Sequence, residues 1–181
     1  MPTLLDITRG GTVRRTERSH RIIEEAESAV DLPDGPILVP LALWLAAHGE
    51  LRDRADLGVW LAPDDEPEAL APALEGLNLI AVRFPVFTDG RGLSSASLLR
   101  ARLGFTGTLR AVGDVLRDLL VPMRRCGFDS FALRDDVDVD TAVHTLETVA
   151  HYYQGDILDP RPLFRRVDRT APDEKAPANA A

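Results

Sequence analysis

The feature that most constrains the fold is a regular alternation of short apolar segments with amphipathic ones, which begins at Ile37. The apolar segments are expected strands over 37–39, 57–62, 77–84, 108–112 and 129–133. Helices are expected over 41–48, 66–74, 94–103, 114–125 and 139–153. Continuous apolar strands separated by helices are typical of parallel sheets with right-handed crossovers. The sequence therefore predicts an α/β fold with a mainly parallel sheet of repeated βα units, which is either partial TIM-barrel-like or open and doubly wound.

The two ends of the chain do not share this pattern. Residues 1–36 contain Arg9-Gly10-Gly11-Thr12 between β-capable pieces, which predicts a small N-terminal hairpin, followed by a short helix over 20–30. Residues 37–158 form the predicted βα-repeat domain. Residues 159–181 form a C-terminal extension, and we expect disorder after 168 because the Pro, Ala and charged residues there have no apolar period.

Charge and hydropathy exclude several classes of partner. The formal net charge is -8 and the isoelectric point is near 5.0. Phosphate backbones and anionic lipids attract clustered Lys and Arg, so we expect neither nucleic acid nor a membrane surface as a partner. The longest apolar run, over 37–47, is about half of the ~20 residues that a membrane span needs. With no apolar signal core at the N-terminus, the expected location is cytoplasmic.

Few residues are suited to metal or redox chemistry. Cys126 is the only cysteine, so an internal disulfide is excluded and a cysteine-bound cluster is not expected. His144, Glu147 and His151 share a stripe of the last expected helix, but no fourth ligand accompanies them, and no metal site is predicted. Walker, Gly-x-Gly-x-x-Gly and nucleophile-elbow motifs are absent from the sequence. We expect no cofactor.

The loop after the third expected strand is the most informative candidate site. In parallel α/β folds, ligands bind where the loops after the strands converge. Here Gly90 and Gly92 bracket Arg91, and Ser94 and Ser95 open the next helix, with Ser94 as its expected cap. Backbone amides, hydroxyls and a guanidinium together suit sulfite, sulfate, phosphate or carboxylate. An ordinary turn with a helix cap has the same sequence, so a purely structural role stays open.

Acidic residues accompany this loop. Asp89 and Asp114, the second of them the expected cap of the following helix, are the candidates for an acid or base, although no catalytic residue is assigned. Both should leave neighbouring strands on the same rim of the sheet as Arg91. Arg83 lies inside an apolar strand, where a charge needs a partner. Asp89 or Asp114 could supply that partner, or Arg83 could lie at a wet end of the sheet.

Several segments together resemble a known bacterial family. They are Phe84-Pro85-Val86-Phe87-Thr88-Asp89-Gly90-Arg91-Gly92, Ser94, Leu98-Leu99-Arg100, Gly107-Thr108-Leu109-Arg110-Ala111-Val112-Gly113-Asp114-Val115-Leu116 and Arg125-Cys126-Gly127-Phe128-Asp129, with Ile37-Leu38-Val39-Pro40-Leu41 and Trp44-Leu45 upstream. The string is similar to domain of unknown function family nine hundred and thirty-four. Its members are often described as oxidoreductases involved in sulfite reduction. Leu93 and Leu119 depart from the family pattern, in which an aromatic residue and a glutamine are common.

The resemblance implies a role in sulfur assimilation and cysteine biosynthesis, beside sulfite reductase, without catalytic residues to carry over. We therefore expect an accessory protein of sulfite reduction without independent catalysis, which binds sulfite reductase, its electron donor or a small oxyanion. The alternative is a small βα-barrel-like enzyme, or an anion-binding protein, that acts on a molecule bearing sulfite, sulfate or phosphate. A third interpretation is a structural homodimer of half-barrels, in which a second copy covers the open sheet edges.

Overall fold

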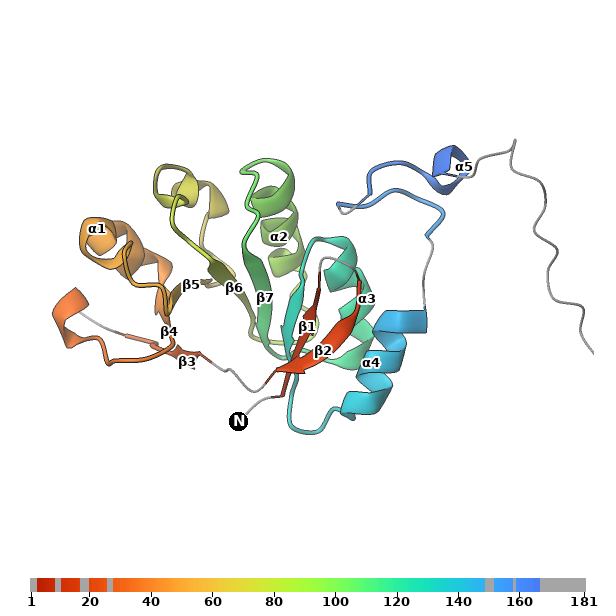
Figure 1. The fold of residues 1–181 in the computed structure, drawn as a ribbon, viewed down its shortest axis with the longest axis horizontal. Coiled ribbons are helices and arrows are strands. Elements are labelled where there is room, and N and C mark those ends of the chain that lie inside the picture. The colour runs from red at the N-terminus through yellow and green to blue at the C-terminus, as the bar shows by residue number, and fades with distance from the viewer. Residues whose placement is uncertain are drawn as a thin grey trace, which may run out of the picture.

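The apolar segments of the sequence join in one curled sheet, with helices along its outer side (Figure 1). The computed structural model of the chain describes residues 3–8, 11–16, 20–25, 28–148, 152–157 and 159–166. The strands are β1 (Leu4–Ile7), β2 (Val13–Thr16), β3 (Arg21–Ile22), β4 (Ile37–Pro40), β5 (Leu57–Leu61), β6 (Leu79–Phe84), β7 (Thr108–Gly113) and β8 (Ser130–Ala132). The helices are η1 (Ala29–Asp31), α1 (Leu41–Leu51), η2 (Pro67–Ala73), α2 (Arg91–Ala101), α3 (Arg117–Arg125), α4 (Val139–Thr148) and α5 (Leu163–Arg166).

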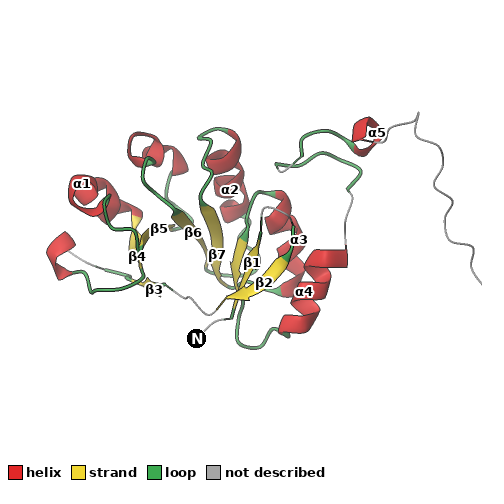
Figure 2. Ribbon diagram, in the orientation of Figure 1, coloured by secondary structure: helices red, strands yellow, loops and turns green. Residues whose placement is uncertain are grey.

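The sheet is mixed, so the expectation of a mainly parallel sheet is wrong. Its strand order is β2-β1-β8-β7-β6-β5-β4-β3. Strands β3 to β8 run parallel in chain order, but β1 pairs antiparallel with both β2 and β8. The predicted N-terminal hairpin is confirmed, and it extends the sheet beyond β8 where a further βα unit would add a parallel strand. Because successive parallel strands are neighbours and crossovers are right-handed, the sheet curls into a half-barrel with its helices outside (Figure 2).

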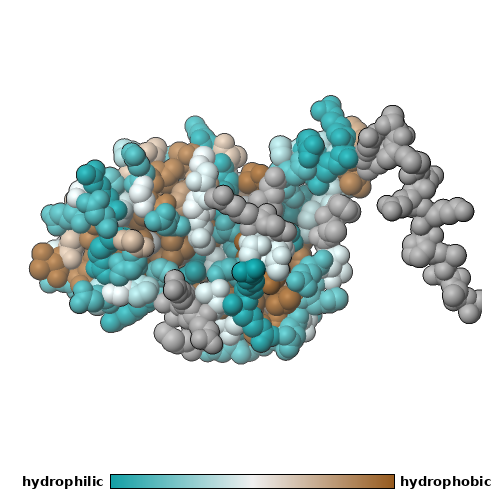
Figure 3. Space-filling view, in the orientation of Figure 1, coloured by the Kyte–Doolittle hydropathy of each residue, from teal (hydrophilic) through white to brown (hydrophobic). Residues whose placement is uncertain are grey.

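Alternate residues along each strand face opposite sides of the curled sheet. The outward-facing residues form the main core with the helices, and Val59, Ile80 and Phe131 are among those with no exposed surface. The inward-facing residues form a second, smaller cluster on the concave side, made of Leu4, Leu38, Trp60, Leu79, Ala81, Val112 and Ala132. In the face that Figure 3 shows, hydrophilic residues predominate on the outer helices and hydrophobic residues appear between them.

The ends of the central strands agree with the sequence prediction within two residues, but several other elements differ. The described residues 20–25 of the expected helix over 20–30 are not helical, because Ile23 N–H donates to the carbonyl of Leu38 and the indole of Trp60 donates to the carbonyl of Ile23. Residues 29–31 form the short 3-10 helix η1, and residues 26 and 27 lie outside the described ranges. These tertiary contacts hold β3 in an extended conformation beside β4. The expected helix over 66–74 is the 3-10 helix η2, since Pro67 and Pro72 lie within it.

The described part of the chain contains no helix that is long and apolar enough to cross a membrane. The disorder expected after 168 concerns residues outside the described ranges. Gly10 of the expected hairpin turn and His151 also lie outside those ranges. Just before the C-terminal extension, Ile157 N–H donates to the carbonyl of Arg125, so the segment that precedes α5 contacts the end of α3.

Contacts of Arg100 explain part of the sequence string on which the family resemblance rests. Its guanidinium donates to the carbonyls of Gly127 at 2.9 Å and of Phe105 and Gly107 at 2.7 Å. It also forms an ion pair with Asp129 at 2.8 Å, whose other carboxylate oxygen accepts from the amide of Leu109. Arg100 thus joins α2 to the segments that precede β7 and β8.

Candidate functional site

The loops that follow β6 and β7 lie on the same rim of the sheet, where the parallel strands end. The amide of Asp114 donates to the carbonyl of Phe84 at 2.7 Å, and the amide of Phe87 donates to the carboxylate of Asp114 at 2.7 Å. Asp114 therefore links the two loops and does not cap the next helix, which begins three residues later at Arg117.

Arg91 is already engaged by two carboxylates. Its Nε and Nη2 donate to the two oxygens of Asp89 at 3.0 and 2.7 Å, and its Nη1 pairs with Asp64. The hydrogen bonds from Arg91 hold the pKa of Asp89 below its usual value. Because the side chain of Arg91 is 54% exposed, an anion that bound there would have to compete with both aspartates in a strongly hydrated position.

The small residues around Arg91 also have structural roles. Helix α2 begins at Arg91 and not at the expected Ser94, because Gly90 is the residue before its first turn and Asp89 accepts from the amide of Arg91. A Cβ on Gly92 would lie 2.6 Å from the ring of Phe84, so glycine permits close packing of α2 on β6. Ser94 is exposed, while the buried Ser95 donates to the carbonyl of Arg91 at 3.3 Å.

Arg83 does not pair with Asp89 or Asp114, contrary to the first of the two expectations. It forms an ion pair with Glu24 at 2.6 Å and lies over the ring of Trp60 at 5.4 Å. The period of β6 is the reason: Arg83 shares the inward side of the strand with Leu79 and Ala81, and it meets the segment after β3 there. Its side chain is partly exposed, in keeping with the alternative of a wet end of the sheet.

The most unusual polar group lies on the concave side of the sheet, in the middle of β7. Arg110 is only 5% exposed. Its Nε donates to the hydroxyl of Ser130 at 2.8 Å, and that hydroxyl donates to Asp6 at 2.5 Å. Its Nη1 lies 3.2 Å from Nδ1 of His20. Among the described residues, no carboxylate oxygen lies within ion-pair distance of the Arg110 guanidinium, and no hydrogen bond is made by its Nη2.

His20 is neutral in this arrangement. A guanidinium can only donate, so Nδ1 of His20 must be the acceptor and carries no proton. Burial lowers the pKa of His20 and the neighbouring charge of Arg110 lowers it further, while Asp56 and Asp6 act in the opposite direction. Burial likewise lowers the pKa of Arg110, although an arginine stays protonated in proteins. Arg110 is therefore the one cation of the network, and the carboxylate of Asp6 acts on it through the Ser130 hydroxyl.

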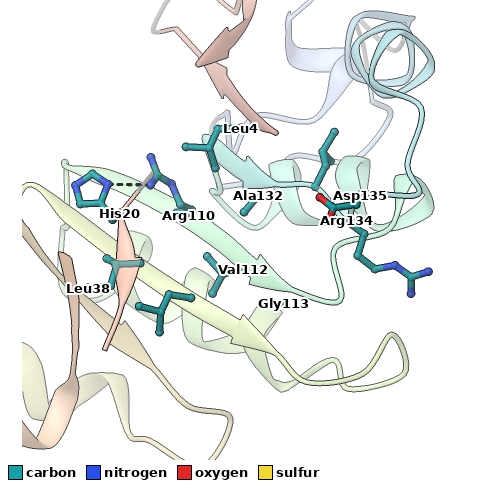
Figure 4. Close-up of a pocket in the computed structure, with 11 residues that line it drawn as sticks. Leu4, His20, Leu38, Arg110, Val112, Gly113, Ala132, Arg134 and Asp135 are labelled. Carbon is teal, nitrogen blue, oxygen red and sulfur yellow. Dashed lines mark hydrogen bonds between the residues drawn. The ribbon is translucent and has the colours of Figure 1, made fainter. Parts of the chain in front are cut away.

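A pocket opens beside this network, with a cavity volume of about 270 Å³. Its walls are the aliphatic side chains of Leu4, Ile22, Leu38, Val112 and Ala132. Figure 4 shows His20 and Arg110 at one end of the pocket, and Gly113, Arg134 and Asp135 at the other end. The second end lies at the rim where the parallel strands finish, so the pocket runs from the rim to the buried guanidinium.

Backbone geometry shapes the rim end of the pocket. Gly113 has a φ of +95°, and a Cβ there would lie 2.3 Å from the carbonyl oxygen of Phe84. Only glycine fits both the conformation and the space. Arg134 is paired with Asp114 at 2.6 Å and also with Asp136, so its charge is neutralised at the rim.

Sequence reasoning did not identify Arg110, His20, Ser130 or Asp6 as site residues. One signal was present: Arg110 is a charged residue inside an apolar strand, the same feature that singled out Arg83. No local pattern connects Arg110 to Asp6 or His20, because the antiparallel hairpin and β3 bring these residues to the concave side.

Metal-ligating residues do not cluster in the ranges that the structure describes: no group of three or more His, Cys, Asp or Glu side chains is placed to hold a metal ion. His144 and Glu147 lie on α4, and His151 falls outside those ranges. Cys126, at the end of α3, is partly buried and unpaired.

The fold and the pocket define a curled α/β half-barrel with a buried cationic group at one end of a mainly apolar pocket on its concave side. The chain belongs to the family described as bacterial protein of unknown function (DUF934), whose model matches residues 58–164. No curated protein matches the chain. The matched range includes Arg110, Ser130 and the residues around Arg91, while Asp6 and His20 precede it.

Proposed function

We propose that this protein binds a small anion in the concave pocket, with Arg110 as the anchoring cation. The observation that carries the proposal is the burial of Arg110 without an ion-pair partner among the described residues. Burying a charge is unfavourable unless an opposite charge compensates it. Asp6 reaches Arg110 only through the Ser130 hydroxyl, whereas a bound anion would contact the guanidinium directly, and the Nη2 of Arg110 is available to donate to it. The pocket reaches the rim where the strands end, which is also where ligands bind in TIM barrels. We propose that the curled sheet is a partial counterpart of such a barrel.

We also propose that the protein acts as an accessory protein of assimilatory sulfite reduction, without catalysis of its own. The sequence string shared with its family supports this, because the resemblance implies a place beside sulfite reductase. The formal charge of -8 would favour association with a basic surface on sulfite reductase or on its electron donor.

Anion binding is tested by titrating the full chain with sulfite, phosphate and acetate, followed by isothermal calorimetry and by NMR of the arginine side chains. We expect saturable binding that Arg110→Met abolishes. Arg102→Met is the matched control, because Arg102 is 68% exposed and pairs with Glu68 on the surface. Arg91→Met tests whether the anion binds at the rim or in the concave pocket. Loss of binding in Arg91→Met with retention in Arg110→Met would place the anion at the rim and refute the concave site.

The accessory role is tested separately, in a bacterium that encodes the chain. We expect sulfite reductase or its electron donor to co-purify with the tagged protein, and sulfite-dependent growth to slow when the gene is deleted. Complementation with wild type should restore growth. If neither protein associates with the chain and sulfite reduction is unchanged by the deletion, the accessory role is refuted, whatever the outcome of the anion titrations.

A further inference from the structure

We infer that the ligand of the concave pocket is a short organic monoanion, with a carboxylate or sulfonate head on Arg110 and an aliphatic body along the pocket walls. This inference rests on the proposed function, because it concerns the same pocket. It goes further by excluding inorganic oxyanions as the preferred ligands and by assigning the direction in which the ligand lies.

The pocket walls favour an aliphatic body. Six aliphatic residues line the pocket, five of them from β1, β3, β4, β7 and β8 and the sixth, Leu133, directly after β8. Sulfite, sulfate and phosphate have no apolar surface to place against these walls, and they would lose strong hydration on entry. An alkyl chain gains roughly fourfold in affinity for each methylene that it buries.

The charge of the network favours a single negative charge on the ligand. Arg110 is the one cation of the network, since His20 accepts its hydrogen bond and is neutral. The carboxylates of Asp6 and Asp56 act on His20, and Asp6 also acts on Arg110. A dianion such as sulfate or phosphate would therefore bring more negative charge than the network can neutralise.

The position of the cation fixes the orientation of the ligand. Arg110 and His20 lie at the buried end, while Asp135 lies at the end near the rim (Figure 4). The head group therefore points inward and the alkyl chain points toward the rim. The exposed Asp135 would repel a second acidic group there, so dicarboxylates should bind less well than monocarboxylates. A cavity of about 270 Å³ is smaller than most drug-sized pockets, so the chain should be only a few carbons long.

The test is a ligand series on the full-length wild-type protein, followed by two-dimensional NMR at millimolar ligand concentrations. The carboxylates are acetate, propionate, butyrate and pentanoate, the sulfonates are methanesulfonate and butanesulfonate, and the inorganic anions are sulfite, sulfate and phosphate. Glutarate tests the second acidic group. We expect affinity to rise roughly fourfold per methylene up to butyrate or pentanoate, with each inorganic anion at least about tenfold weaker than butyrate.

Two variants make the result specific to the pocket. Arg110→Met should abolish binding of the whole series. Ala132→Val narrows the wall without removing the cation, so it should reduce the gain in affinity per methylene. The surface variant Arg102→Met, outside the pocket, should bind the whole series like wild type. The comparison of the two head groups decides between carboxylate and sulfonate.

Two results would separate this inference from the proposed function. If sulfite or phosphate binds as tightly as butyrate, the inference is overturned and the anion pocket stands. If no anion in the series binds, the proposed function falls together with the inference. Binding that rises with chain length but survives in Arg110→Met, in a variant whose circular dichroism shows a native fold, would also overturn the inference.

Discussion

Replacing Arg100 with methionine should destabilise the fold more than the same change at Arg102, the residue that follows the end of α2. Arg100 is 12% exposed in its side chain and donates to three carbonyls and to Asp129. Methionine keeps much of the aliphatic stem, so the loss is chiefly that of the guanidinium. Arg102 lies on the surface with a side chain that is 68% exposed, which makes Arg102→Met a matched control.

The expected magnitude follows from burial. Removing one partner of a fully buried ion pair costs about 3–5 kcal/mol, but the side chain of Asp129 is 36% exposed, so water would partly replace the lost guanidinium and the cost should be smaller. Asp129 would be the remaining partner, and burial already raises its pKa. The three carbonyls would also lose a charged donor, although such contributions are not additive with the ion pair. We expect Arg100→Met to lower the free energy of unfolding by about 2–3 kcal/mol, the range of hydrogen bonds made by a charged group, against about 0–1 kcal/mol for Arg102→Met.

Urea denaturation, followed by the fluorescence of Trp44 and Trp60, measures both losses. Asp129→Asn and the double variant complete a thermodynamic cycle, in which we expect the two single losses to be non-additive. The two variants are compared by their losses in the free energy of unfolding. If the loss for Arg100→Met exceeded that for Arg102→Met by less than about 1 kcal/mol, the structural explanation of this part of the family motif would be refuted.

Two further predictions concern residues of the concave pocket. Gly113→Ala should destabilise the fold by at least about 1–2 kcal/mol, because alanine is strained at a φ of +95° and its Cβ would meet the Phe84 carbonyl at 2.3 Å; an unchanged urea midpoint would contradict this. His20 has a folded-state pKa below its unfolded value of 6.5, so the unfolded state binds more protons and stability should fall as pH drops below 6.5. Urea denaturation at pH 7.5 and 5.5 should show this loss of stability in wild type and a smaller loss in His20→Gln. An equal loss in both proteins would refute the assignment to His20. The charged groups that act on His20 are Arg110, Asp56 and Asp6.

The rim shows how far local sequence patterns reach. Glycine, aspartate and arginine after β6 indicated a loop at the ends of the strands, and the structure places Asp89, Arg91 and Asp114 there. The partners of these residues did not follow from the pattern. Asp64 comes from the preceding βα loop and Arg134 from the following one, so only the packing of adjacent strands decides that they neutralise Arg91 and Asp114.

The sequence by itself determined the alternation of strands and helices, because apolar periodicity is a local property of each segment. It also determined the hairpin at the N-terminus, where two β-capable pieces flank a glycine-rich turn. Only the tertiary structure decided that this hairpin joins β8 in antiparallel pairing and makes the sheet mixed. The same pairing brings Asp6 to Ser130, and β3 brings His20 to Arg110. These contacts join residues about a hundred positions apart, and their free energy depends on burial and strand order, which no local pattern encodes.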